Sequence, residues 1–185
     1  MISIWGKVAP EVPIDPKTRP SLLYSGNFGK KQNIDQLLPL LKSLSDSAIN
    51  VDVVMRGDGS ERERIAEEVR ARGISNVQFL PLVPADEFTA ALQAANIHLV
   101  PQAANVANYA LPSKLFSIMA AGRPFICIAQ PGSPLDMLAA RSGAGLCVPP
   151  GDDAALFDAV TNLLGDPDRQ LQMGRNGQAF IQTHM

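Results

Sequence analysis

Short apolar runs alternate with longer segments of helical periodicity along most of this chain. The apolar runs have the length of strands and cover residues 22–25, 51–55, 77–80, 97–100, 125–129 and 144–148. Helical segments follow them at residues 34–44, 61–72, 85–95, 113–121, 135–141 and 154–164. The strand runs are apolar throughout, which is typical of strands covered on both faces. The alternation predicts an α/β fold, a doubly wound, Rossmann-like parallel sheet of about six strands with right-handed crossovers.

The chain divides into a short leading segment and one domain. Its 185 residues match the usual size of a single compact domain. Residues 1–20 contain four prolines and no hydrophobic period, which predicts a linker or interdomain segment. We expect the folded domain to cover residues 21–185.

Composition excludes several classes of protein. Hydrophobic residues make up 46% of the chain and charged residues 18%, which excludes a chain disordered by low hydrophobicity and high charge. No apolar run is long enough to span a membrane, and the start lacks the pattern of a signal peptide. The net charge of −2 supplies no basic surface for nucleic acid. Cys127 and Cys147 lie in apolar runs, which predicts buried thiols in a reducing, cytoplasmic compartment.

The connection after the first strand run is a candidate anion site. In doubly wound sheets, ligands bind beyond the carboxyl ends of the strands. Gly26 and Gly29 allow backbone N–H groups to approach an anion, and Lys30 and Lys31 add positive charge. The sequence is not a Walker A loop, because Gln32 stands where a Ser or Thr would bind magnesium. The alternative is a surface turn with solvated lysines.

The connection after the second strand run is a second glycine loop. Gly57 and Gly59 allow a tight turn, and Ser60 or Asp58 could cap the helical segment that follows. The dinucleotide fingerprint is incomplete, since Arg62 occupies the place of its third glycine. A plain strand-to-helix turn explains this loop better than a dinucleotide site does.

The connection over residues 101–113 is much longer than the others, which is typical of a binding loop. It ends in Pro112, Ser113 and Lys114, where Pro112 suits the start of a helix and Ser113 can cap it. A helix N-terminus beside a lysine favours phosphate binding. The alternative is that Lys114 is a solvated residue of a first helical turn.

The two histidines suggest no metal site. His98 lies inside an apolar strand run, where a core histidine is expected, and His184 lies near the C-terminus. No Ser-His-Asp arrangement is visible. From the residues alone, the chain is predicted to be a phosphate- or nucleotide-binding α/β domain.

Five segments, in this order along the chain, resemble one family. They are Leu-Tyr-Ser-Gly-Asn-Phe-Gly-Lys-Lys-Gln (23–32), Val-Met-Arg-Gly-Asp-Gly (54–59), Asn-Val-Gln-Phe-Leu-Pro (76–81), and Leu-Pro-Ser-Lys-Leu-Phe (111–116) with Ala-Ala-Gly-Arg-Pro (120–124). From about residue 21 to 177, the chain resembles the C-terminal, donor-binding domain of a GT-B glycosyltransferase. Within the group 1 retaining family, the resemblance is to the exopolysaccharide, colanic-acid-type branch.

The resemblance implies a site for a nucleotide sugar, a UDP-sugar or GDP-sugar, without a metal or other cofactor. It implies that Lys114 and Lys31 are catalytic, meeting the charge of the leaving diphosphate. The implied binding residues are Gly26, Asn27 and Lys30 for phosphate, Gly57 and Gly59 for the nucleotide, Leu82 and Val83 for the base, and Pro112 and Ser113 beside the diphosphate. The acceptor would be a glycan or lipid-linked molecule in polysaccharide biosynthesis.

Some family features are absent. The two glutamates of many relatives fall on Tyr109 and Ser117, and the usual arginine of the first loop is Asn27. We also expect the N-terminal acceptor domain and the family's final helix to be missing from this chain. We therefore expect a fragment that is inactive alone, from an enzyme that could associate peripherally with a membrane.

Two other functions are alternatives, although the residues that the second of them requires around the diphosphate are not found in the sequence. One is a stand-alone nucleotide-binding or nucleotide-sugar-binding module without catalysis. The other is half of a GT-B-like sugar-nucleotide epimerase, which would need acidic and histidine residues around the diphosphate.

Overall fold

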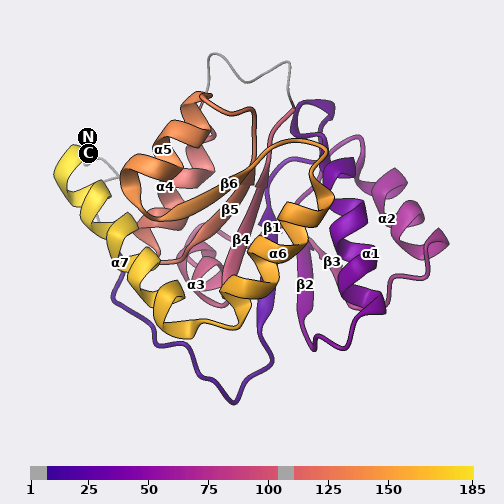
Figure 1. Ribbon diagram of the computed structural model, residues 1–185, viewed down its shortest axis with the longest axis horizontal. Helices are drawn as coiled ribbons and strands as arrows, with labels where there is room; N and C mark the ends of the chain where they lie inside the picture. Colours follow the sequence, from indigo (N-terminus) through magenta and orange to yellow (C-terminus); the bar gives the residue numbers. More distant parts are fainter. Residues whose placement is uncertain (1–7, 104–110) are drawn as a thin grey trace.

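The structure, a computed structural model, describes residues 8–103 and 111–185. Its centre is one sheet of six strands in the order β3-β2-β1-β4-β5-β6, and every neighbouring pair is parallel (Figure 1). The strands are β1 (Ser21–Ser25), β2 (Asp52–Arg56), β3 (Val77–Leu80), β4 (Ile97–Pro101), β5 (Phe125–Ile128) and β6 (Gly145–Val148). The predicted doubly wound parallel sheet is confirmed.

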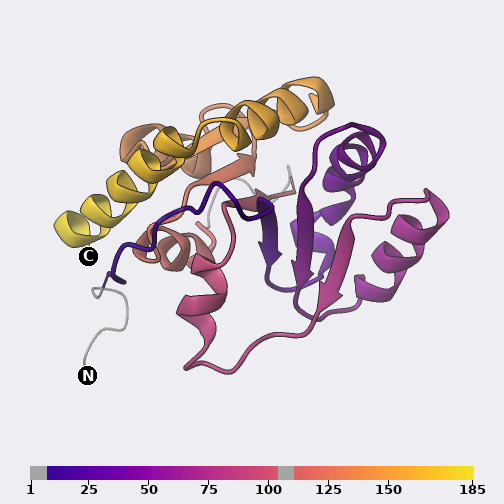
Figure 2. The same cartoon turned by 90° about the horizontal axis from the view of Figure 1, so that it is seen from below.

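Helices cover both faces of this sheet. They are α1 (Leu38–Asp46), α2 (Arg62–Ala71), α3 (Phe88–Gln93), α4 (Ser113–Ala120), α5 (Pro134–Ser142), α6 (Asp153–Leu164) and α7 (Pro167–His184), with short 3-10 helices η2 (Lys30–Gln32) and η3 (Ile34–Leu37). Figure 2 shows α1 and α2 on one side of the first three strands and α3 on the other. This arrangement places the loops that follow the strands along one edge, the carboxyl edge.

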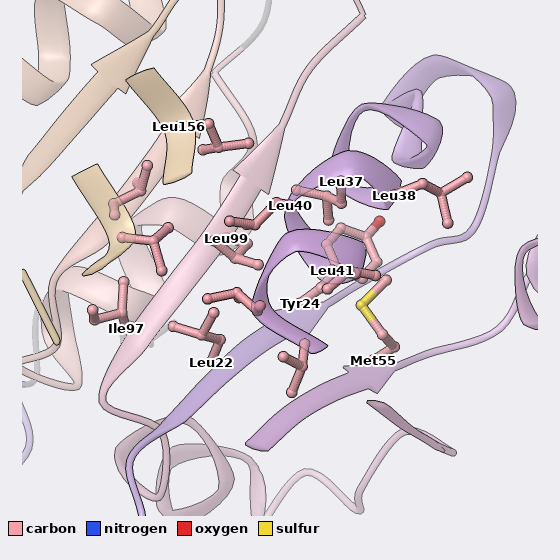
Figure 3. Packing of buried hydrophobic residues seen from close by; sticks show 14 of the residues in the cluster. Leu22, Tyr24, Leu37, Leu38, Leu40, Leu41, Met55, Ile97, Leu99 and Leu156 are labelled. Carbon is pink, nitrogen blue, oxygen red and sulfur yellow. The ribbon is translucent and has the colours of Figure 1, made fainter. Parts of the chain in front are cut away.

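Two hydrophobic clusters hold the layers together. One joins α1, α2 and α6 to the sheet and includes Leu22, Tyr24, Leu41 and Met55, which lie close to one another in Figure 3. The other lies between the sheet and α3, α4 and α5, with Phe125 fully buried in it. Burial of this kind stabilises the fold by roughly 25 cal/mol for each Å² of apolar surface removed from water.

The outer strands depart from the expectation of burial on both faces. All residues of β4 and β5 are buried, but Asp52 of β2 and Gln78 of β3 are exposed. Gln78 lies on β3, an edge strand of the sheet, and Asp52 is the first residue of the inner strand β2, where it pairs with Arg19 at 3.1 Å.

Element boundaries shift where local chemistry requires it. The helix expected over residues 34–44 begins as η3, and α1 starts only at Leu38 because Pro39 lies in its first turn. The helix expected over residues 85–95 shortens to α3. The other helices and strands that were expected from the sequence are present, and their ends agree with the expected ranges within about two residues.

Helix α7 was not predicted from the sequence. It contains two glycines, which are poor helix formers, yet both are needed for packing. A Cβ on Gly174 would overlap the carbonyl oxygen of Gly122, and one on Gly177 would lie 3.2 Å from Met119. Within the described parts of the chain, neither α7 nor any other helix is long and apolar enough to cross a membrane.

The segment before β1 lies along the domain, next to α7 in Figure 2. The N–H of Ala9 donates to Ala120 at 2.9 Å, and Gln178 donates to the carbonyl oxygen of Ala9 at 2.8 Å. Glu11 pairs with Arg175 at 2.7 Å. This segment is therefore held against α4 and α7 at several points.

Candidate phosphate- and nucleotide-binding site

The two glycine loops at the carboxyl edge form one hydrogen-bonded unit. The N–H of Gly26 donates to the carbonyl oxygen of Arg56 at 2.9 Å, and the N–H of Phe28 donates to the backbone carbonyl oxygen of Asp58 at 2.8 Å. In return, the N–H of Glu61 donates to the carbonyl oxygen of Phe28 at 2.9 Å. The structure thus brings together the first and second loops that the sequence singled out.

This contact requires glycine at residues 57 and 59. Gly57 has φ of 145°, and a Cβ there would overlap the carbonyl oxygen of Gly26. Gly59 has φ of 147°, and a Cβ there would lie 2.6 Å from the carbonyl oxygen of Phe28. Both conformations are rare for residues with a side chain. Glycine at these two positions therefore allows the backbones of the two loops to approach each other closely.

The expected capping of α2 was wrong. Glu61 is its N-cap residue, and no side chain caps the helix. Asp58 instead accepts the N–H of its neighbour Gly59 at 2.8 Å, and Ser60 is exposed. The tight turn at the glycines uses Asp58 locally, so that its carboxylate does not reach the first turn of α2.

Ser113 also does not cap α4. Pro112, in extended conformation at ψ of 122°, takes the N-cap position, and Ser113 is already the first helical residue. Among the described residues, no side-chain cap is present on α4, and the N–H of Leu115 donates to the carbonyl oxygen of Pro112 at 2.9 Å. Within the described stretches, the N–H groups of Ser113 and Lys114 and the exposed Ser113 hydroxyl have no partner and can donate to an anion.

Lys114 extends from the first turn of α4 over the end of β1. Its Nζ lies 4.4 Å from the centre of the Tyr24 ring, and a Cβ on Gly26 would lie 3.2 Å from the same nitrogen. Lys114 is half-buried, and this desolvation lowers its pKa from 10.5 to about 8. The structure therefore places a partly desolvated lysine beside the first glycine loop, unlike the solvated residue of the alternative interpretation.

The other cations of the first loop are placed differently. Lys30 and Lys31 lie in η2 with exposed side chains, and Asn27 is exposed as well. The backbone of Lys31 is fixed, because its carbonyl oxygen accepts the N–H of Ala103 at 3.2 Å. Both lysines belong to the same loop as Gly26, but neither side chain is buried with Lys114, and Lys30 lines a small cavity with Asp35 and Arg64.

A mainly apolar groove of about 650 Å³ lies between α3 and α4. Val83, Phe88, Phe116 and Ser117 line its part nearest the carboxyl edge, and residues 8–10 line it as well. Val83 was expected to frame a base and does line this groove. Leu82, its expected companion, is 58% exposed.

Ser117 stands one helical turn after Lys114 and lines the groove. The family's other glutamate position, Tyr109, lies outside the described residues. Across residues 8–103 and 111–185, no three His, Cys, Asp or Glu side chains form a group that could hold a metal ion.

His98 is the buried core residue that the sequence predicted. Its Nε2 lies 2.9 Å from the carbonyl oxygen of Leu92, and burial lowers its pKa to about 4. Cys127 is buried, whereas Cys147, its registered partner on β6, is half-buried. Both are free thiols.

Tyr24 was not predicted from the sequence to be part of the site. This residue is fully buried at the end of β1, and its hydroxyl donates to the carbonyl oxygen of Asn27 at 2.6 Å. The sequence shows only an aromatic residue two positions before Gly26. An aromatic residue at this place is also expected in a buried strand, so it does not indicate a role in a site.

A parallel doubly wound sheet with glycine loops and a lysine-bearing helix N-terminus at its carboxyl edge defines a Rossmann-like domain. The family is shown by the sequence model of glycosyl transferases group 1, which matches residues 9–180. The chain belongs to this family.

Individual relatives agree with this assignment. The colanic acid biosynthesis glycosyl transferase WcaI of Escherichia coli (strain K12) is 33% identical over 151 residues, which cover 80% of this chain and 36% of WcaI. Sucrose-phosphate synthase from Thermosynechococcus elongatus superposes with a TM-score of 0.76 at 25% identity, over 89% of this chain and 41% of that one. HepE from Anabaena, solved in complex with UDP, gives a TM-score of 0.74 at 15% identity, over 89% of this chain and 44% of HepE.

The resemblance to GT-B group 1 glycosyltransferases is therefore confirmed. The chain spans about a third of the length of the curated relatives that it matches.

Proposed function

We propose that this domain binds the nucleoside diphosphate sugar donor of a glycosyltransferase, and that Lys114 and the first turn of α4 receive the leaving diphosphate. One observation carries the proposal. The Lys114 ammonium lies beside Gly26 at the carboxyl edge, Lys114 itself belongs to the first turn of α4, and Ser117, one helical turn later, lines the groove together with Val83.

The chemistry follows from where charge develops. When the bond between the sugar carbon and the diphosphate oxygen breaks, negative charge grows on that oxygen. A lysine and a helix N-terminus already aimed at this charge stabilise the transition state, since they need no reorganisation. We assign the same role to Lys31, whose exposed side chain can approach the diphosphate from η2. Transfer with retention of configuration is part of this proposal.

The groove between α3 and α4 would hold the nucleoside. The described residues that line it carry no charge, so the base would bind mainly by apolar contact with Val83, while the Ser117 hydroxyl would replace the family's carboxylate at the ribose. Donor binding would need no metal, because lysines and helix N–H groups neutralise the diphosphate. UDP in the HepE structure supports a uridine donor, although GDP fits the same neutral lining.

Transfer itself would require an acceptor-binding domain from outside this chain. The name of WcaI supports an acceptor in polysaccharide biosynthesis, a glycan or a lipid-linked molecule. Such an acceptor would bring the full-length enzyme to the membrane surface. Free thiols at Cys127 and Cys147 support a reducing, cytoplasmic setting.

Calorimetric titration of the chain with UDP and GDP tests the proposal, with UMP and uridine as comparison ligands. We expect at least one diphosphate to bind, with tenfold or greater preference over its monophosphate, because Lys114 and α4 act on the added charge. A folded sample that gives no heat and no thermal shift at millimolar diphosphate would contradict the proposal. Equal affinity for UDP and uridine would contradict phosphate binding at Lys114 and α4.

A further inference from the structure

Tyr24 is placed where the sheet, the first glycine loop and α4 meet. The side chain is fully buried in the cluster under α1, with its ring near Leu41 and Met55 (Figure 3). The ring of Phe28 meets it edge-on, with centres 5.3 Å apart and planes at 84°. Tyr24 therefore has one fixed orientation.

The hydroxyl of Tyr24 fixes the first glycine loop from below. It donates to the carbonyl oxygen of Asn27 at 2.6 Å, and a Cβ on Gly26 would lie 3.6 Å from it. Burial raises the pKa of Tyr24, so the phenol remains a donor at any working pH. This bond ties the loop to the rigid end of β1.

The ring face of Tyr24 holds Lys114. The Nζ lies 4.4 Å from the ring centre, well within the range of a cation–π contact. Within the two described stretches of the chain, Lys114 makes no hydrogen bond or ion pair, so the ring is what orients its ammonium. The same ammonium lies beside Gly26, whose loop the Tyr24 hydroxyl fixes.

We propose that Tyr24 is a positioning residue for the donor site. Its ring contacts the ammonium of Lys114 and its hydroxyl binds the first glycine loop, so that Tyr24 sets the ammonium against this loop. This inference rests on the proposed function and deepens it. Tyr24 touches no donor itself, and it acts through Lys114 and the backbone of Asn27.

Two substitutions separate the two contacts. Tyr24→Phe removes the hydroxyl and keeps the ring, while pentafluorophenylalanine at residue 24 keeps a similar shape but reverses the charge distribution of the ring. Leu22→Ala is the matched control, because Leu22 is fully buried on the same face of β1 but has no contact with Lys114.

The first measurement needs no nucleotide. Competitive labelling of amines between about pH 6 and pH 10, read by peptide mass spectrometry, gives the pKa of Lys114. We expect Tyr24→Phe and Leu22→Ala to leave this pKa unchanged. Pentafluorophenylalanine should lower it by about 0.5–1, since the cation loses the attraction of the ring. An unchanged or raised pKa would overturn the role of the ring, whether or not the domain binds a donor.

The second measurement is the affinity for UDP. Tyr24→Phe should weaken binding about three- to tenfold by releasing the first loop, and pentafluorophenylalanine should weaken it further. Leu22→Ala should bind as the unchanged chain does. Equal affinity in all four proteins would overturn the positioning role while leaving the proposed function intact. If the unchanged chain does not bind UDP or GDP, the proposed function fails, and the labelling result alone decides the ring contact.

Discussion

Gly57 passes so close to Gly26 that a Cβ on Gly57 would occupy the space of the Gly26 carbonyl oxygen. The two residues follow neighbouring strands, β2 and β1, and their contact fixes the spacing of the two loops at the carboxyl edge. The shape of the candidate site therefore depends on this backbone contact as well as on side chains.

Gly57→Ala should displace the first loop and lower the free energy of unfolding by roughly 2–4 kcal/mol, because the new methyl group meets backbone that cannot rotate away. Nucleotide binding should weaken as well. Denaturant unfolding measures the loss, with Gly132→Ala as the control, since Gly132 has φ of 76° but open space around it. A loss no greater than that of Gly132→Ala would show that only the backbone conformation matters, not the contact with Gly26.

Lys114→Met should stabilise the isolated domain by roughly 1–3 kcal/mol at neutral pH, because the charged form of a lysine with a lowered pKa opposes folding. The sign follows from linkage. Between the folded pKa of about 8 and the unfolded value of 10.5, the unfolded chain holds more protons, so stability of the unchanged protein rises with pH. Thermal unfolding at neutral and at alkaline pH should show this rise in the unchanged protein and less of it in Lys114→Met. Equal stability of the two proteins at both pH values would mean that Lys114 is solvated.

Affinity for a nucleoside diphosphate should fall as pH rises through about 8, because only the protonated Lys114 attracts the anion. Binding should also take up a proton near that pH, since the bound anion raises the pKa of the lysine. Calorimetry in two buffers of different ionisation enthalpy measures this uptake. A constant affinity up to pH 9 would contradict a role for Lys114.

Removal of divalent metal should change the affinity for UDP or GDP less than about threefold, because lysines and helix N–H groups supply the positive charge. Parallel titrations in EDTA and in magnesium test this. Magnesium-dependent binding, tighter by tenfold or more, would mean that the metal–nucleotide complex is the true ligand.

The sheet was predictable because its strands are continuous apolar runs, such as Phe125–Ile128, separated by helices. The position of Lys114 at a helix start was predictable too, since Pro112 marks that start. The contact of Lys114 with Tyr24 was not, because it joins two elements about ninety positions apart and depends on how α4 reaches over the end of β1.

Helix α7 shows a different limit of the sequence. Gly174 and Gly177 argue against a helix on propensity alone, and the reason for them exists only in the folded state, where α7 touches Gly122 and Met119. Ser113 shows the opposite error, since a residue suited to capping became the first helical residue after a proline.

We expect the diphosphate of a nucleoside diphosphate to bind at Lys114. Titration of UDP and GDP into the unchanged chain, Lys114→Ala and Lys42→Ala tests it most directly. Lys42 is the matched control, because it pairs with Asp46 on α1 and lies away from the carboxyl-edge loops. We predict that Lys114→Ala weakens binding roughly 10- to 150-fold, as expected for loss of a hydrogen bond to a charged group, and that Lys42→Ala binds as the unchanged chain does. Equal affinity of Lys114→Ala and the unchanged chain would contradict the account.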